Sequence, residues 1–196
     1  MDGQGFEGLV RTSRSCRRFG GDEVGEDVLR ELVAAARLAP TGNNTQQLRF
    51  RLVSGPEACA GVFAHLRWAA ALTDWEGPEP DERPGGYVVI CLPAAAASNE
   101  VRHMDVGIAA QTMALAATSR GLGACLVKSF DAGLASELAL PEGLVPALVV
   151  AVGPRAETAV LEEAGSAAAA PHGLAYWREP DGTHHVPKLS VDELVV

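Results

Sequence analysis

The stretch DVGIAAQTMALAATSRGLGACLV, residues 105–127, joins an apolar helical segment, a glycine turn and an apolar run. Between Asp105 and Arg120, apolar side chains cover most of a helix's circumference, a pattern typical of a helix that is buried on most sides. We expect Asp105 to cap the start of this helix and Gly121 to mark its end. Its many alanines would let another helix approach closely, including one from a second subunit. The residues that follow predict a strand over Ala124–Val127.

Working outward, continuous apolar runs predict two more buried strands, Tyr87–Leu92 and Val145–Val152. The pattern also predicts helices over Glu26–Ala39, Glu57–Ala71 and Ala132–Leu140, a strand over Phe50–Ser54, and a hairpin of Tyr176–Glu179 and Thr183–Val186 around Pro180-Asp181-Gly182. Thr73–Gly86 predicts a surface loop. Residues 157–172, with the low-complexity run SAAAAP, predict a flexible loop. Because strands and helices are mixed without a strict βαβ period, we expect an α+β sheet covered by helices.

The composition sets limits on fold and partners. A chain of 196 residues with 47% apolar content is the size of one domain and is not disordered throughout. Its formal charge of −9 argues against nucleic acid and anionic membrane as partners. The four widely spaced cysteines argue against a disulfide framework or a metal site and fit the cytoplasm. No secretory signal and no transmembrane run is visible.

Several familiar functional motifs are missing from the sequence. There is no Gly-x-Gly-x-x-Gly fingerprint for a dinucleotide, no phosphate loop and no Gly-x-Ser-x-Gly. His184 and His185 fall in the predicted hairpin with no other metal ligand nearby. We therefore expect them to be two surface residues of a strand rather than a metal site.

Three segments carry groups that suit a ligand. Arg14-Ser15-Cys16-Arg17-Arg18-Phe19 can grip a phosphate, although alone it is typical of a solvated basic turn. Pro40-Thr41-Gly42-Asn43-Asn44-Thr45-Gln46-Gln47 offers amides that suit a heterocycle, although alone it is typical of a polar loop. Residues 121–129 form, by themselves, a glycine turn that feeds a buried strand.

In this order and spacing, the segments resemble the motifs of the nitroreductase-like FMN-dependent oxidoreductase family. Residues 13–19 match its Arg-Arg-Ser-x-Arg-x-Phe/Tyr pattern, and residues 40–50 match its Pro-Ser/Thr-x-x-Asn-x-Gln-Pro-Trp-x-Phe pattern. Asp105-Val106-Gly107 and Gly121-Leu122-Gly123 match the two ends of its apolar helix, and Pro187-Lys188 matches its C-terminal Pro-Lys. The resemblance covers residues 9–153 and resumes near residue 176.

The resemblance implies a single domain over residues 1–196, with a central mixed or antiparallel sheet covered by helices, in an intertwined homodimer. It implies FMN at two sites in the subunit interface and no catalytic side chain. It implies three groups of cofactor contacts. At the phosphate and ribityl chain they are Arg14, Ser15, Arg17 and Lys188, and along the isoalloxazine ring they are Val127, Lys128 and Ser129. The partner subunit would contribute Pro40, Thr41, Gly42 and Asn44, with Gln46 supporting their loop.

The activity that the resemblance implies is ping-pong hydride transfer through the flavin, from NADH or NADPH to a small electron-poor acceptor such as a nitroaromatic or a quinone. The chain departs from the family pattern at Ser13 and Ser190, where arginines are common, and at Gln47-Leu48, which replaces Pro-Trp. Two alternatives stay open. One is a specialised flavoprotein dehydrogenase that acts on a biosynthetic intermediate. The other is a ligand-binding or flavin-binding module without turnover, which the two serines favour.

Overall fold

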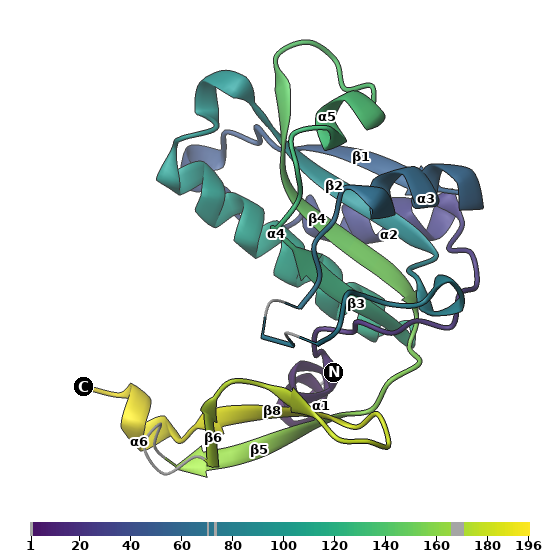
Figure 1. The fold of residues 1–196 in the computed structure, drawn as a ribbon. Helices are drawn as coiled ribbons and strands as arrows, with labels where there is room; N and C mark the ends of the chain where they lie inside the picture. Colours follow the sequence, from purple (N-terminus) through teal and green to yellow (C-terminus); the bar gives the residue numbers. More distant parts are fainter. Residues whose placement is uncertain (1, 70, 73, 166–170) are drawn as a thin grey trace.

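The main sheet of the computed structural model has four antiparallel strands in the order β1-β2-β4-β3 (Figure 1). The structure describes residues 2–69, 71–72, 74–165 and 171–196. The strands are β1 (Arg49–Ser54), β2 (Gly86–Pro93), β3 (Leu122–Val127) and β4 (Leu144–Pro154). All four predicted strands are therefore confirmed within two residues at each end, and the predicted α+β class is confirmed.

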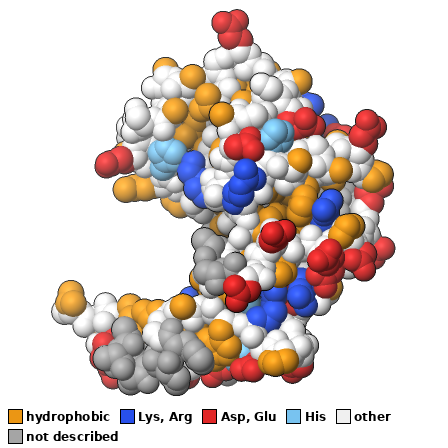
Figure 2. Space-filling view, in the orientation of Figure 1, with side chains coloured by type: hydrophobic (Ala, Val, Ile, Leu, Met, Phe, Trp, Pro, Cys, Tyr) orange, Lys and Arg blue, Asp and Glu red, His pale blue; other side chains and the backbone are white. Residues whose placement is uncertain are grey.

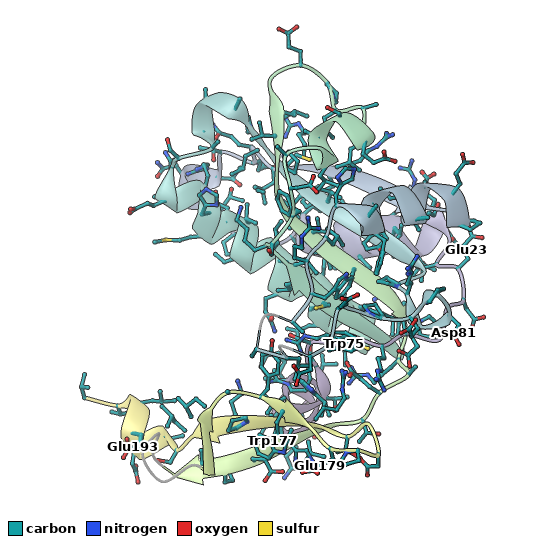
Figure 3. The ribbon with its side chains drawn as sticks, in the orientation of Figure 1. Glu23, Trp75, Asp81, Trp177, Glu179 and Glu193 are labelled. Carbon is teal, nitrogen blue, oxygen red and sulfur yellow. The ribbon has the colours of Figure 1, made fainter. Side chains whose placement is uncertain are left out.

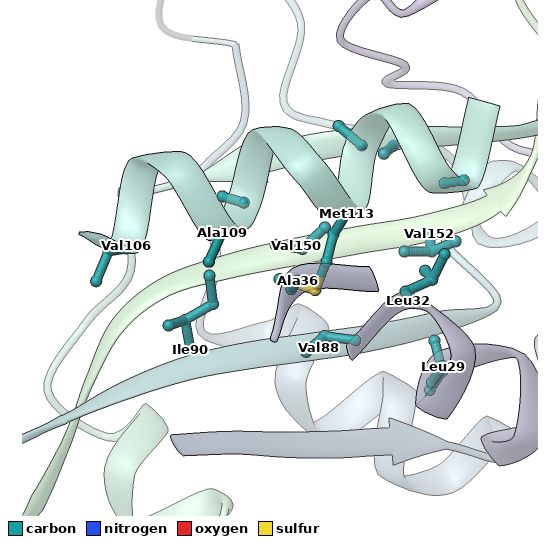
Figure 4. Packing of buried hydrophobic residues seen from close by; sticks show 14 of the residues in the cluster. Leu29, Leu32, Ala36, Val88, Ile90, Val106, Ala109, Met113, Val150 and Val152 are labelled. Carbon is teal, nitrogen blue, oxygen red and sulfur yellow. The ribbon is translucent and has the colours of Figure 1, made fainter. Parts of the chain in front are cut away.

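Alternating residues of β2 serve two cores, because this strand is covered on both faces. Val88 and Ile90 point into a cluster with α2 (Glu26–Ala36) and α4 (Glu100–Thr118). Figure 4 shows Met113 and Ala109 of α4 above these two side chains. The neighbouring residues of β2 belong to the other cluster, which includes residues of α3 (Pro56–Ala64) and α5 (Leu134–Glu137). Burial on both faces explains the continuous apolar run of this strand.

The apolar helix begins earlier than predicted. Asn99 is its N-cap and accepts a hydrogen bond from the backbone N–H of Arg102 at 3.2 Å. The expectation that Asp105 caps the helix is therefore wrong, because Asp105 lies in its interior and forms an ion pair with Arg102. The helix that is predicted over Glu57–Ala71 ends at Ala64, since Leu66 instead pairs with Phe130 in a β-bridge.

We call residues 157–196 the C-terminal arm. It contains a second sheet of order β5-β8-β7, which projects from one end of the main sheet (Figure 1). Its elements are β5 (Ala159–Gly165), β6 (Pro171–Leu174), β7 (Trp177–Arg178), β8 (His184–Leu189) and α6 (Val191–Leu194). The predicted hairpin is confirmed by the antiparallel pairing of Trp177 with His185. The flexible loop expected over residues 157–172 is a strand over Ala159–Gly165, because β8 supplies a parallel partner. Residues 166–170 of that loop lie outside the described residues.

The N-terminal segment closes the edge of the main sheet. After α1 (Gly3–Thr12), Ser15 forms a parallel bridge with Ala124 of β3, and Phe19 forms an antiparallel bridge with Arg155. Phe19 is fully buried. This segment therefore lies beside β3 and next to the start of the C-terminal arm, so that three parts of the chain meet there.

All four cysteines are buried free thiols. Burial raises the pKa of Cys16 to about 12 and that of Cys125 to about 11. A thiol with such a pKa carries little thiolate near neutral pH, so neither is a reactive nucleophile. Among the described residues, no helix has both the length and the hydropathy to cross a membrane.

Candidate functional site

A cavity of about 190 Å³ opens where β3 ends, next to the N-terminal segment and the C-terminal arm. Arg17, residues 67–69, residues 125–129 and Tyr176 line it. The structure thus brings together four residues that the sequence assigns to one ligand: Arg17, Val127, Lys128 and Ser129. Figure 2 shows that the molecule is hollowed on this side, between the main body and the arm.

The end of β3 places Lys128 at the cavity. Val127 makes the last pair of β3 with β4, and the chain then turns away from the sheet. The backbone N–H of Arg67 donates to the carbonyl of Ser129 at 2.9 Å, which fixes this turn. Lys128 Nζ donates to the carbonyl of Ala147 at 2.9 Å. Its ammonium group is therefore held in place while its positive charge stays beside the cavity.

Two side chains of the arm fix the guanidinium group of Arg17. Its Nη1 lies 3.0 Å from Nε2 of His184, and its Cζ lies 4.4 Å from the ring centroid of Tyr176. Among the residues that the structure describes, Arg17 forms no ion pair. Its charge therefore has no acidic partner among the described residues, and its orientation is set before any ligand binds.

His184 is completely buried, so the expectation that it is a surface residue is wrong. Burial, and next the charge of Arg17, lowers its pKa to about 4. At neutral pH the ring is uncharged, and Nε2 can accept a hydrogen bond from Arg17. The sequence could not show this, because the ring is covered by Arg17 of the N-terminal segment and by Tyr176 of the arm. His185, the neighbour of His184, is only partly buried and lies 2.6 Å from Glu162.

A buried carboxylate, Glu157, joins the N-terminal segment to the arm. Its Oε2 pairs with Nη2 of Arg178 at 2.8 Å, with side chains that are 3% and 11% exposed. Its Oε1 accepts a short hydrogen bond from the backbone N–H of Arg17. The sequence alone does not predict this contact, because Arg17 lies 140 residues from Glu157 along the chain.

Arg14 and Ser15 lie next along the same segment. Arg14 Nη2 donates to the carbonyl of Val10 at 2.9 Å, and Ser15 is exposed. Burial and the nearby charge of Arg155 lower the pKa of Arg14. Within the described ranges, neither Arg14 nor Arg155 forms an ion pair. A bound anion would offset this concentration of positive charge, so this donor set fits a phosphate group. Arg155 is not among the residues predicted from the sequence, although its place in Gly-Pro-Arg, directly after an apolar strand, was a signal.

The loop that contains Pro40, Thr41, Gly42, Asn44 and Gln46 is held by α4. The backbone N–H of Gly42 donates to Asp105 Oδ1 at 2.8 Å, and its carbonyl accepts from Arg102 Nη2 at 3.1 Å. Asn44 and Gln46 adopt left-handed backbone conformations, with φ of 51° and 48°. Gln46 Nε2 donates to Asn44 Oδ1 at 3.2 Å. Gln46 therefore contacts the loop that it is expected to support.

Within one chain, this loop and the basic segment lie apart. The loop contacts the N-terminal half of α4, whereas Ser15 pairs with Ala124, just beyond the other end of this 19-residue helix. Such a helix is about 28 Å long. Lys188 is also remote, because it lies four residues beyond His184 on β8, about 13 Å along an extended strand. A single chain therefore supplies only part of the expected site.

Comparisons with known proteins agree with this fold. Residues 10–154 match the profile of the Nitroreductase family. A 5,6-dimethylbenzimidazole synthase from Rhodospirillum rubrum is 29% identical over 65% of this chain and 70% of its own length. An FMN complex from Desulfovibrio desulfuricans, described as a nitroreductase, is 29% identical, with a TM-score of 0.62 over 76% of this chain and 86% of its own.

A nitroreductase family protein from Clostridium novyi NT shares the fold, with a TM-score of 0.64 and 18% identity over 79% of this chain and 86% of its own. The motifs of the N-terminal segment, the loop held by α4 and the end of β3 fall within the matched range. The family profile matches most of the length of the chain, and the chain therefore belongs to the nitroreductase family.

Proposed function

We propose that this chain is an FMN-dependent oxidoreductase that uses NADH or NADPH to reduce a small electron-poor organic acceptor, such as a nitroaromatic or a quinone. Membership of the nitroreductase family supports flavin-dependent oxidoreductase chemistry. The observation that carries the proposal is that Arg17, Val127, Lys128 and Ser129 line the same cavity. The FMN that is bound by the similar protein from Desulfovibrio desulfuricans supports the choice of cofactor.

The residues present fit FMN. Arg14 and Arg17 would hold the phosphate and ribityl chain together with Ser15, and Arg155 would add a positive charge. The residues Val127, Lys128 and Ser129 would lie along the isoalloxazine ring and offer it a backbone N–H. Bound FMN would supply the redox chemistry, accepting a hydride from the nicotinamide and passing electrons to the acceptor. His184 and Tyr176 would orient the guanidinium group of Arg17, and Trp68 would cover one wall of the cavity.

We infer that the complete site needs a second copy of the chain. A cavity of about 190 Å³ is smaller than the usual ~300–1,000 Å³ of a ligand pocket. In a homodimer, the partner would add the loop of Pro40, Thr41, Gly42, Asn44 and Gln46, and Lys188 would reach the phosphate.

The exposed side of α4 supports this dimer. Val101, Met104 and Ile108 stand three and four residues apart on the helix and are 45%, 63% and 40% exposed. Such a stripe of apolar residues favours contact with another subunit. Sedimentation at micromolar concentration should give about twice 20.4 kDa. A stable monomer with full flavin content would contradict a shared site.

The test of the function begins with the purified protein. It should be yellow and release FMN, not FAD, on denaturation. NADH or NADPH should bleach the visible absorption of the flavin under anaerobic conditions, and a quinone or a nitroaromatic should restore it. A colourless protein that also fails to take up added FMN would contradict the proposal.

A second candidate is a flavoprotein dehydrogenase for a biosynthetic intermediate. The similarity to a 5,6-dimethylbenzimidazole synthase favours it. In that case the protein would still bind FMN, but no simple quinone or nitroaromatic would restore the absorption that NADH or NADPH bleaches. A protein that binds FMN and is bleached by neither nicotinamide would instead support a binding module without turnover.

We also propose a cytoplasmic location without a nucleic-acid or membrane partner. Four free, buried cysteines suit a reducing compartment. A net charge of −9 disfavours polyanionic surfaces. Fractionation of the cells that produce the protein, followed by detection with an antibody, would test this location.

A further inference from the structure

A second and larger cavity, of about 380 Å³, lies between α3, the loop that precedes β2, and β2 itself. Gly21, Glu23, Arg83 and Tyr87 line it together with apolar residues of α3. Figure 3 shows Glu23 and Asp81 on the same side of the molecule. None of the residues that line this cavity belongs to the proposed flavin site.

The hydroxyl group of Tyr87 is buried and unsatisfied within the described part of the chain. The side chain is completely buried, and its hydroxyl makes no hydrogen bond among the described residues. Burial also raises its pKa, so the group stays protonated. A buried donor without an acceptor destabilises a fold. Because Tyr87 lines the cavity, an acceptor on a ligand there would satisfy this donor.

Arg83 offers a positive charge to the same cavity. Its Cζ lies 4.0 Å from the ring centroid of Phe63, which orients the guanidinium group by a cation–π contact. Its Nε is buried without a hydrogen-bond partner, and it forms no ion pair within the described part of the chain. A guanidinium group that stacks on a ring keeps its N–H donors in the plane, where they can bind a carboxylate.

The N-terminus of α3 adds partial positive charge. Gly55 is the N-cap, has no side chain to accept from the first turn, and lines the cavity with Pro56 and Cys59. Pro56 has no N–H and the N–H of Cys59 donates to the carbonyl of Gly55, so it is the helix dipole that favours an anion at this end. Glu23 is the one acid among the described residues that line the cavity, and its negative charge would oppose a ligand with two negative charges more strongly than a ligand with one.

We propose that this cavity binds a small organic monocarboxylate with an apolar body. The carboxylate would accept hydrogen bonds from Arg83 and Tyr87, and the apolar body would pack on Phe63, Pro56 and Pro84. The volume falls within the ~300–1,000 Å³ of small-molecule sites. The proposal does not depend on the flavin site, because the two cavities share no residue.

The test uses benzoate as the probe and benzamide as its uncharged control. Each is titrated into FMN-saturated protein, with calorimetry for affinity and amide NMR shifts for location. Benzoate should bind and shift the amides of residues 55–63 and 83–87, whereas benzamide should bind at least about 10-fold more weakly. Arg83→Gln should weaken benzoate binding by about 10- to 100-fold, and Tyr87→Phe by about 3- to 10-fold. Arg120→Gln, at an exposed position two residues after α4, is the matched control and should leave the affinity unchanged.

Both site variants should remain folded. Tyr87→Phe removes a hydroxyl without a partner, so its melting temperature should equal or exceed that of the wild type. If Arg83→Gln fails to fold, Arg83→Lys keeps the charge but loses the planar donors and should still weaken binding. The proposal is overturned if benzoate fails to bind at about 10 mM, if both site variants bind it like the wild type, or if it shifts Arg17 and Lys128 instead.

Discussion

Two buried ion pairs hold the two halves of the proposed flavin site, and they differ in what each pair connects. Arg102 and Asp105 stand three residues apart on α4, with side chains 7% and 4% exposed, and together bind Gly42. Glu157 and Arg178 join two segments of the arm, and Glu157 also accepts a hydrogen bond from the backbone N–H of Arg17. The loop is therefore supported by the main core, whereas Arg17 is supported only when the arm has folded.

The largest expected effect is on the pair in α4. Asp105→Ala leaves Arg102 charged and buried, and removes the acceptor of the Gly42 N–H. We expect the free energy of unfolding to fall by about 3–5 kcal/mol, the usual cost of breaking a buried pair. Urea denaturation measures this, with the exposed Glu100→Ala on the same helix as control. If the free energy of unfolding falls by the same small amount in both variants, the core does not depend on this pair.

The next largest effect concerns FMN binding by Arg17, in the half of the proposed site that the arm supports. Arg17→Ala should weaken FMN binding by about 30- to 150-fold, which corresponds to ~2–3 kcal/mol for a charge-assisted hydrogen bond. Lys188→Ala should have a smaller effect, because lysine acts as a point charge. Fluorescence titration measures both variants with FMN and with riboflavin, which lacks the phosphate. Equal losses for the two ligands would show that Arg17 does not contact the phosphate.

The arm should also lose stability as pH falls. His184 has a pKa of about 4 in the folded protein against 6.5 ordinarily, so the unfolded chain takes up the proton first. Its contribution is intact above about pH 6.5 and is lost as pH falls toward 4, with about 2 kcal/mol gone near pH 5. Arg17, Arg178, His185, Glu157 and Tyr176 surround the ring. Denaturation at several pH values measures the slope.

In that experiment His184→Gln should flatten the pH dependence, while His103→Gln, whose side chain is exposed on α4, should keep it. A wild-type slope that survives in His184→Gln would assign the titration to another group.

The smallest effect tests the loop. Gln46→Ala removes the hydrogen bond to Asn44 Oδ1, which contributes about 0.5–1.5 kcal/mol, so FMN binding should weaken by about 2- to 10-fold. Unlike Arg17→Ala, this variant should weaken riboflavin binding by the same factor, because the loop is placed at the ring and not at the phosphate. A loss confined to FMN would contradict this placement.

The parts predicted well from sequence are those where one pattern dominates. The runs at Tyr87–Leu92 and Val145–Val152 predict strands buried on both faces, and both strands are present. The hairpin is also confirmed, because Pro180-Asp181-Gly182 suits only a turn. The motifs at Arg17 and at Val127–Ser129 pointed to one site, and these residues line one cavity.

The parts that failed depend on distant contacts. Asp105 is acidic and near a helix start, but Asn99 is the N-cap and Asp105 faces Arg102. Periodicity cannot show which of two nearby polar residues is buried. Likewise, β5 becomes a strand only because β8 pairs with it from twenty-five residues away, Ala159 with His184. His184 is buried through Arg17 and Tyr176, which no local pattern links to it.

The bridges of the N-terminal segment also set an order of events during synthesis. Ser15 cannot form its bridge until Ala124 has been synthesised, and Phe19 cannot form its bridge until Arg155 has been synthesised. At ~5–20 residues per second, the first residues to leave the ribosome remain without their partners for roughly 5–30 seconds. During this time Phe19, which is buried in the finished protein, is exposed to water and to chaperones. A circular permutant that places residues 1–19 after the arm, joined by a linker long enough to span the two termini, would remove this delay.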